Sequence, residues 1–247
     1  DVADFASMER VFAELAAQPQ PLRGIIHAAG QLDDGILLNQ SWQRFAPVLA
    51  AKVQGSWHLH QLSQGLTLDF MVFFSSASAL LGMQGQSNYA AANAFMDALA
   101  EQRRQQKLPA LSINWGPWAQ TGMAANRGEK QVRGVRPLLP NEGLTVLQQL
   151  LGRSGQVGVL AVDWSAVEWQ SGANRNLLAA WLQPIVTQPR QGTLAKTLAA
   201  LPTFERTAHL ASHLQAEVAA ILQLAQPPLL QQGFADMGMD SLMALEL

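Results

Sequence analysis

The amino-acid sequence predicts an α/β fold: a doubly wound parallel sheet, followed by a linker and a partial α-helical domain. Two observations lead to this prediction. Short, continuously apolar runs alternate with amphipathic stretches along the first two thirds of the chain, and the composition changes after Trp169. Strand–helix–strand alternation is typical of a parallel sheet covered by helices on both faces, whose ligands bind at the carboxyl ends of the strands.

The expected elements follow from the length and the period of each apolar pattern. The strands are apolar throughout, as in a sheet that is buried on both faces. We expect strands at residues 22–27, 69–74, 110–114 and 157–162. We expect helices, from apolar residues at helical spacing, at 6–17, 41–64, 88–106 and 141–151, the last with Asn141 as its N-cap.

The last third of the chain has a different character. Residues 170–202 are rich in Gln, Pro, Thr and Gly, which favours an interdomain linker. Apolar residues return at helical spacing over 207–224, and Pro227-Pro228 ends that helix. We therefore expect three parts, which are residues 1–165, 166–204 and 205–247.

Composition excludes several classes of function. Hydrophobic residues make up 49% of the 247 residues and charged residues 14%, so the chain can bury a sizeable core. A net charge of -2 leaves no basic field for nucleic acid or for an anionic membrane. With no cysteine, disulfides and thiolate catalysis are excluded. No apolar run approaches the roughly 18 residues of a membrane span and no signal peptide is apparent, so we expect a cytoplasmic protein.

One group of polar residues has the types and spacing of an acid–base site. Ser76 closes an expected strand, Tyr89 is the single tyrosine, and Asn93 follows it by one helical turn. Lys52 lies in the preceding helix, and an ammonium near a phenol lowers the pKa of that phenol because it favours the phenolate. Such a phenol can protonate a carbonyl oxygen that a serine hydroxyl orients. Taken singly, these residues also fit a core tyrosine, a strand-end hydroxyl and a solvated lysine.

Longer motifs around these residues resemble a known family. Phe74-Ser75-Ser76, the segment 85–95 (GQSNYAAANAF) and the segment 114–119 (NWGPWA) look like the ketoreductase domains of modular polyketide synthases. These domains belong to the short-chain dehydrogenase/reductase superfamily, whose fold is Rossmann-like. The resemblance covers about residues 1–165. It implies that Tyr89 donates the proton, that Ser76 binds the ketone oxygen, and that Lys52 and Asn93 complete a catalytic tetrad.

The same resemblance implies NADPH as the hydride source. The residues it places beside the cofactor are Asp1, Val2, His27, Ala28, Ala29, Gly30, Lys52, Tyr89, Pro117 and Trp118. The phosphate-binding pattern Gly-x-Gly-x-x-Gly is absent from the chain, and the family pattern places it upstream of Asp1. We therefore expect an N-terminally incomplete ketoreductase that binds NADPH poorly by itself.

A second motif bears on stereochemistry. In the resembling family, Leu-Asp-Asp at the place of Leu32, Asp33 and Asp34 marks the B-type, which forms a D-configured hydroxyl. The A-type carries a tryptophan eight residues before the tyrosine, where this chain has Leu81. The resemblance also places Met123 at the opening of a substrate lid. The acidic pair alone fits a solvated turn or a helix cap.

The end of the chain resembles the attachment site of an acyl carrier protein. Residues 238–247 read GMDSLMALEL, and the resemblance implies that Ser241 carries 4′-phosphopantetheine. An ordinary helix cap is the alternative for Asp240-Ser241 alone. No later carrier helices follow Ser241, so we expect this carrier domain to be partial.

Other polar residues support no site. His58 and His60 are two residues apart on an expected helix and point apart, so they make a poor metal pair, and we expect no metal. Arg103 and Arg104 lie near a helix end, where we expect them to complement the helix dipole.

The leading hypothesis is the stereospecific reduction of a carrier-bound β-ketoacyl thioester. An alternative is a non-catalytic scaffold that presents a carrier arm, and a third reading is that a separate polypeptide supplies the first half of the sheet. The expected partners are an acyl chain on a carrier domain and other polyketide synthase domains. Nucleic acid and membranes are not expected, and an oligomer is left open.

Overall fold

The computed structural model of the chain describes residues 1–122, 134–163, 193–221, 226–231 and 233. The chain divides into two compact units, Asp1–Gln183 and Pro184–Leu247, and each is described by itself. Met123 and Ser241, predicted as substrate-lid and attachment residues, lie outside the described residues.

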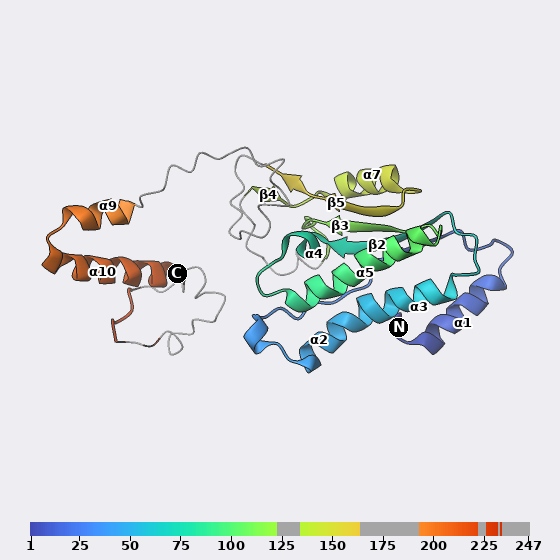
Figure 1. The fold of residues 1–247 in the computed structure, drawn as a ribbon, viewed down its shortest axis with the longest axis horizontal. Coiled ribbons are helices and arrows are strands. Elements are labelled where there is room, and N and C mark those ends of the chain that lie inside the picture. Colours follow the sequence, from blue (N-terminus) through green and yellow to red (C-terminus); the bar gives the residue numbers. More distant parts are fainter. Residues whose placement is uncertain (123–133, 164–192, 222–225, 232, 234–247) are drawn as a thin grey trace. The chain divides into compact units, whose positions relative to one another are not determined.

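The first unit is built on a parallel sheet of four strands (Figure 1). Neighbouring strands follow the order β1 (Gly24–His27), β2 (Phe70–Ser76), β3 (Leu111–Trp115) and β5 (Gly155–Val159). Every pairing is parallel, and Ser76 of β2 stands beside Trp115 of β3. The parallel α/β fold predicted from the sequence is therefore confirmed.

Helices cover both faces of this sheet (Figure 1). On one face, α5 (Ser87–Gln105) and α3 (Gly55–Leu62) pack on β2, and α1 (Phe5–Ala16) packs outside α3. On the other face lies α7 (Pro140–Leu150). Each face has its own hydrophobic core, one around Met71, Phe73 and Met96 and the other around Val72, Leu111 and Ile113.

Two features at the C-terminal side of the sheet differ from the sequence prediction. The run 157–162 is not one strand: β5 ends at Val159, and β6 (Ala161–Val162) pairs antiparallel with β4 (Val135–Arg136) in a second, two-stranded sheet. Asn141 is not the N-cap of α7, because Pro140 already occupies the first helical turn, where its fixed φ and missing N–H are favourable. The Glu142 carboxylate instead accepts the N–H of Leu139, at 3.0 Å.

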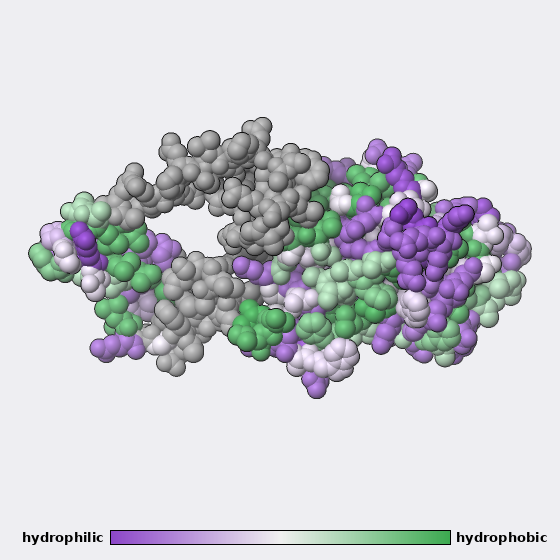
Figure 2. Space-filling view, in the orientation of Figure 1, coloured by the Kyte–Doolittle hydropathy of each residue, from purple (hydrophilic) through white to green (hydrophobic). Residues whose placement is uncertain are grey.

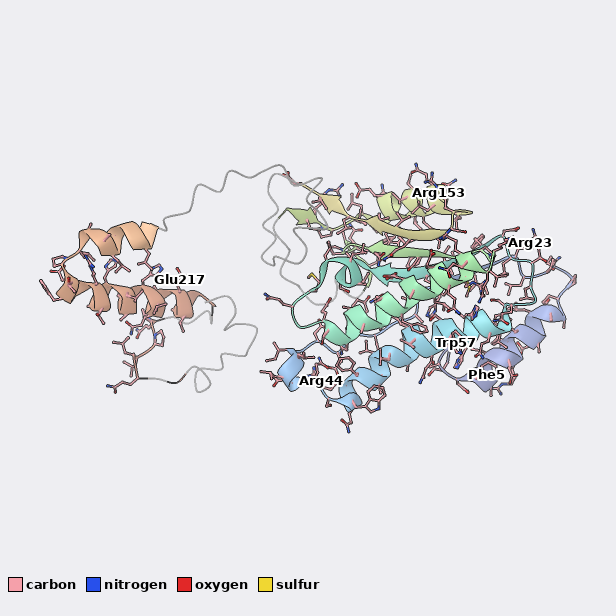
Figure 3. All side chains as sticks on the ribbon, in the orientation of Figure 1. Phe5, Arg23, Arg44, Trp57, Arg153 and Glu217 are labelled. Carbon is pink, nitrogen blue, oxygen red and sulfur yellow. The ribbon has the colours of Figure 1, made fainter. Side chains whose placement is uncertain are left out.

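Surface side chains mark two places on the first unit. Arg23 donates to Asp69 through Nε (2.9 Å) and joins the amino ends of β1 and β2 (Figure 3).

Apolar residues gather over the short helix η1 (Leu37–Asn39), where Figure 2 shows a hydrophobic patch. Leu38 is 91% exposed there. No helix among the described residues has the length and apolar character to cross a membrane.

The second unit contains two described helices, α9 (Thr193–Ala200) and α10 (Thr203–Ile221). The helix predicted over 207–224 therefore begins four residues earlier, directly after Pro202. The Pro202 carbonyl accepts the N–H of Glu205 at 3.0 Å, which forms the first turn. Residues 222–224 lie outside the described part.

Candidate active site

Lys52 reaches the sheet from an unusual turn of helix. The helix α2 (Trp42–Leu49) continues into a π-helical segment, Ala50–Gln54, and then into α3. Such π-turns widen a helix locally and are frequent at functional sites. Lys52 is 2% exposed, and its Nζ donates to the Phe74 carbonyl of β2 at 2.9 Å. The alternative of a solvated lysine is therefore wrong.

Burial controls the charges around Lys52. Burial lowers the pKa of Lys52 from 10.5 to about 8, while the charge of Asp97 acts in the opposite direction. Lys52 is therefore mostly an ammonium at pH 7. Burial, together with the Lys52 charge, lowers the pKa of His27 to about 4, so His27 is neutral at pH 7.

The helix α5 brings Tyr89 and Asn93 to Lys52. The Lys52 Nζ lies 5.3 Å from the centre of the Tyr89 ring, within cation–π range. Tyr89 is 8% exposed and packs with Val48 and Ala92. The Asn93 Nδ2 donates to the Tyr89 carbonyl at 2.7 Å, as expected for residues one turn apart. Its Oδ1 is buried and has no hydrogen-bond partner in the described part of the chain.

Ser76 lies at the carboxyl end of β2, where it caps the short helix α4 (Ala77–Leu81). Its Oγ accepts the Ser78 N–H at 3.1 Å and the Ser78 hydroxyl at 3.0 Å. A hydroxyl oxygen that accepts two bonds keeps its own hydrogen as a donor. Ser76 can therefore donate to a carbonyl oxygen at the edge of the sheet where parallel α/β folds bind ligands.

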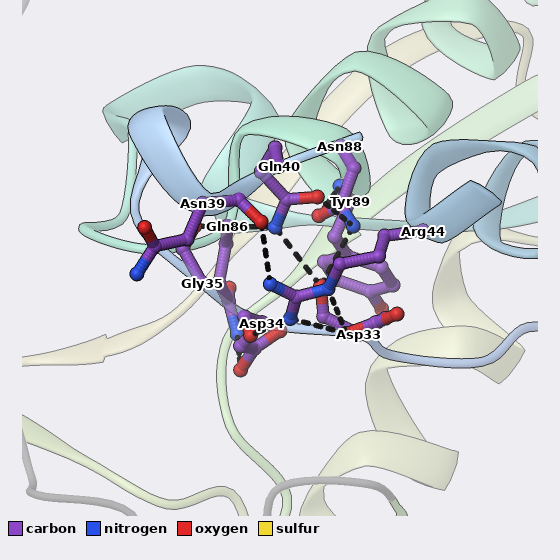
Figure 4. Close-up of polar contacts among 9 residues, drawn as sticks. All are labelled: Asp33, Asp34, Gly35, Asn39, Gln40, Arg44, Gln86, Asn88 and Tyr89. Carbon is purple, nitrogen blue, oxygen red and sulfur yellow. Dashed lines mark hydrogen bonds and ion pairs between the residues drawn. The ribbon is translucent and has the colours of Figure 1, made fainter. Parts of the chain in front are cut away.

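The acidic pair Asp33-Asp34 belongs to a loop that polar side chains hold in front of α5 (Figure 4). Arg44, which projects from α2 (Figure 3), donates to the Asp33 carboxylate through Nε at 2.9 Å and to the Asp34 carbonyl at 2.5 Å. From α5, Asn88 donates to the Asp33 carbonyl at 2.7 Å. Leu32 packs against the cluster that contains Tyr89. The hydrogen bonds of Arg44 and Asn88 therefore hold this loop to α2 and α5, and the role of the acidic pair in the site stays a prediction.

The structure places the other predicted cofactor residues around the carboxyl end of β1 and after β3. Ala28 and Ala29 follow His27 and are exposed, and Gly30 is half-buried. The His27 Nε2 is buried, and none of the described residues forms a hydrogen bond with it.

The remaining predicted cofactor residues, at the start of the chain and after β3, contact other residues of the first unit. The Asp1 carboxylate accepts the N–H of Ala3 at 3.0 Å, and Val2 packs on the core between α1 and α3. The Pro117 carbonyl accepts the N–H of Leu138 at 2.8 Å. Trp118 packs against α7 and lies 5.0 Å from the Trp115 ring. Their contacts to a cofactor stay predictions.

Comparison with known proteins identifies the family. A family model described as KR domain matches residues 1–120. The polyketide synthase GfsE of Streptomyces halstedii is 35% identical over 271 residues, an alignment that covers 100% of this chain and 7% of that protein. The spectinabilin polyketide synthase system protein NorA of Streptomyces orinoci is 37% identical over 267 residues, covering 100% of this chain and 14% of that protein. Residues 1–120 belong to the ketoreductase domain family of polyketide synthases.

Solved ketoreductases share the fold. The first ketoreductase of the tylosin synthase is 42% identical, with a TM-score of 0.60, and the match covers 67% of this chain and 36% of that chain. A structure described as an A-type ketoreductase from a modular polyketide synthase is 36% identical, with a TM-score of 0.62 and coverages of 67% and 36%. The chain thus spans well under half of these solved ketoreductases and a small part of the synthases.

Sequence reasoning missed several polar residues of this ketoreductase site. Asp97 lies four residues after Asn93 on the same face of α5, so the helical period alone could have indicated it. Asn88 lies within the motif segment 85–95 but was given no role, and Arg44 lies in none of the motifs.

Arg103, predicted to complement the dipole of α5, lies in the last turn of that helix, and it is buried there. It is 1% exposed and donates to the Ser63 hydroxyl at 3.2 Å and to the Pro109 carbonyl at 3.3 Å, because α3 covers this end of α5. Its NH1 also lies 3.0 Å from His60 Nδ1. No cluster of three potential metal ligands occurs among the described residues.

Proposed function

We propose that this ketoreductase domain reduces a carrier-bound β-ketoacyl thioester to the β-hydroxyacyl thioester, with NADPH as reductant. The observation that carries the proposal is the buried Lys52 ammonium 5.3 Å from the ring of Tyr89, the single tyrosine of the chain. Ser76 stands at the end of β2, the strand whose Phe74 carbonyl binds that ammonium.

The residues present fit a nicotinamide cofactor. Two buried polar atoms, His27 Nε2 and Asn93 Oδ1, lack hydrogen-bond partners among the residues that the structure describes, although buried polar atoms are nearly always paired. The exposed Ala28 and Ala29 at the end of β1 leave room for a close ligand. NADPH, when bound, supplies the hydride.

The side chains then provide the proton and the orientation. The Ser76 hydroxyl donates a hydrogen bond to the ketone oxygen. Tyr89 transfers its phenolic proton to that oxygen, so that hydride and proton together convert the ketone into a secondary alcohol. The Lys52 charge stabilises the phenolate that remains. Asn93 holds the turn of α5 that carries Tyr89, through its bond to the Tyr89 carbonyl.

The variant Tyr89→Phe tests this proposal, in a synthase polypeptide that includes these residues. It keeps the ring that packs on Val48 and removes only the hydroxyl, so the fold should persist. We expect NADPH oxidation with a β-ketoacyl thioester to fall about 100-fold or more, the usual contribution of a positioned acid. Full activity of this variant would reject the assignment and favour the scaffold alternative.

The proposed stereochemical outcome is B-type, with a D-configured hydroxyl. It is supported by Leu32, which packs against the cluster that contains Tyr89, by Asp33 and Asp34 of the same loop, and by Leu81 in place of the A-type tryptophan. Chiral chromatography of the product tests it, and an L-configured product would contradict it. Met123 remains a proposed lid residue.

The second unit is proposed to carry the acyl chain. Ser241 would be modified with 4′-phosphopantetheine, whose thiol supplies the thioester that a chain without cysteine cannot form. Incubation with coenzyme A and a phosphopantetheinyl transferase should raise the mass of the chain by one phosphopantetheine, and Ser241→Ala should abolish that increase. An unmodified wild-type chain would contradict the proposal. Other polyketide synthase domains are the proposed partners.

A further inference from the structure

A buried polar cluster lies beneath the candidate active site, and the proposed reaction does not use it. Its centre is Asp97 of α5, which is 8% exposed. The Asp97 Oδ1 accepts the Ser112 hydroxyl at 2.5 Å, and its Oδ2 accepts the Asn114 amide at 2.8 Å. Ser112 and Asn114 both belong to β3 and are fully buried. The cluster thus fastens the helix that carries Tyr89 to the sheet.

The hydrogen-bond donors around the buried Asp97 carboxylate are neutral. Within the part of the chain that the structure describes, Asp97 forms no salt bridge, and its two hydrogen bonds come from neutral groups. A buried carboxylate without a counter-charge is costly. The cation that responds to it is Lys52, because the Asp97 charge raises the pKa of Lys52 against the effect of burial.

Asn114 extends the cluster to the end of β2. Its Nδ2 lies 2.9 Å from the Ser75 Oγ and 3.1 Å from the Ser76 carbonyl, besides its contact with Asp97. An amide nitrogen has two hydrogens for these three acceptors, so it shares them. Gln156 of β5 donates to the Asn114 Oδ1 at 2.9 Å and fixes which way the amide faces.

We propose that Asp97 is the counter-charge of Lys52 and a positioning residue for the active site, holding the carboxyl end of β2 through Asn114. The proposal rests on the burial of Asp97 and Lys52 and on the hydrogen bonds that join Asp97 to the carboxyl end of β2 through Asn114, whereas its importance for catalysis rests on the proposed function. Asp97 touches neither substrate nor cofactor, and it acts through Lys52 and through the backbone of Ser76.

The described titratable groups that interact with the Lys52 ammonium are His27 of β1 and Tyr89 and Asp97 of α5. His27 is neutral at pH 7 and above, since its pKa is about 4. Among these groups the Asp97 carboxylate is the negative charge that raises the pKa of Lys52. Removing it should lower the pKa of Lys52, and each unit lost reduces the ammonium-to-amine ratio about tenfold at a given pH.

The variant Asp97→Asn tests the coupling with little change of shape. Its amide oxygen still accepts from Asn114, and the Ser112 hydroxyl can rotate to accept from the new amide. Ser112→Ala is the matched control, because it removes one hydrogen bond of the cluster and leaves the charge. The readout is an NMR titration of lysine side chains in the full chain. The chain has four lysines, and loss of a signal in Lys52→Met assigns the resonance.

We expect a lower Lys52 pKa in Asp97→Asn and an unchanged one in Ser112→Ala. An unchanged pKa in Asp97→Asn overturns the inference, and so does an equal decrease in both variants, which would show a structural effect. If Asp97→Asn is too unstable to titrate, thermal unfolding of the double variant Lys52→Met/Asp97→Asn decides. The double variant, which lacks both charges, should then be more stable than Asp97→Asn. If the losses of stability from the two substitutions simply add, the coupling is overturned.

Enzyme kinetics separate this inference from the proposed function. In a synthase polypeptide that reduces β-ketoacyl thioesters, Asp97→Asn should lower kcat and move the alkaline limb of its pH profile to lower pH, whereas Ser112→Ala should leave that limb in place. A wild-type protein without any reduction contradicts the proposed function but leaves the NMR result standing. Normal reduction with an unmoved limb in Asp97→Asn contradicts the positioning role alone.

Discussion

The buried Lys52 should make the stability of the chain depend on pH in the alkaline range. Its pKa is lowered from 10.5 to about 8, mainly by burial. Between these values the unfolded chain binds the proton more tightly than the native state, so the free energy of unfolding rises with pH. One pKa unit corresponds to about 1.4 kcal/mol, which gives an increase of about 3 kcal/mol between about pH 7.5 and 10.5.

Urea unfolding of the wild type and of Lys52→Met, followed by tryptophan fluorescence, measures this contribution. Other groups that titrate in the range cancel in the difference between the two proteins. The wild type should gain about 3 kcal/mol relative to Lys52→Met across the window. Lys107→Met is the control, since Lys107 is exposed, and it should show no such gain. Parallel pH curves for the wild type and Lys52→Met would refute the burial of a charged Lys52.

Three further substitutions probe the frame around the site. The native pKa of His27 is lowered to about 4, so the free energy of unfolding of the wild type should fall by about 3 kcal/mol as the pH falls from 6.5 to 4. In His27→Asn, urea unfolding should show this decrease no longer. Gly143→Ala should lower stability by about 1–3 kcal/mol, because a Cβ there would lie 2.3 Å from the indole ring beside it, whereas Gly65→Ala, with open space, should not. Arg44→Met should raise hydrogen exchange in the loop that contains Asp33, and unchanged protection there would show that Arg44 does not hold it.

Local patterns were enough to predict the frame of the first unit. Continuous apolar runs place β1, β2 and β3 within two residues of their observed bounds, because β2 and β3 are buried on both faces and β1 is partly buried. The run 157–162 misled the prediction because β5 lies at an edge of the described sheet and the chain turns to pair with β4. The local pattern of apolar residues does not reveal that change of strand partner.

The site was predictable where chemistry and spacing coincide. Tyr89 and Asn93 share a helix face, so their proximity follows from the helical period. The burial of Lys52 does not follow from the sequence around it, since the π-helical turn that carries Lys52 is buried by its packing against α5, a distant part of the chain. The role of Asn114 likewise depends on contacts from three separate elements, which no local pattern reveals.

The transfer of hydride and proton at Tyr89 is tested most directly by isotope labelling. A synthase polypeptide that includes these residues would be given a β-ketoacyl thioester and NADPH with deuterium at the transferable position, and the product analysed by mass spectrometry and chiral chromatography. The wild type should form a D-configured β-hydroxyacyl product with one deuterium on the β carbon, and Tyr89→Phe should form almost none. Deuterated product from Tyr89→Phe at the wild-type rate would contradict the account.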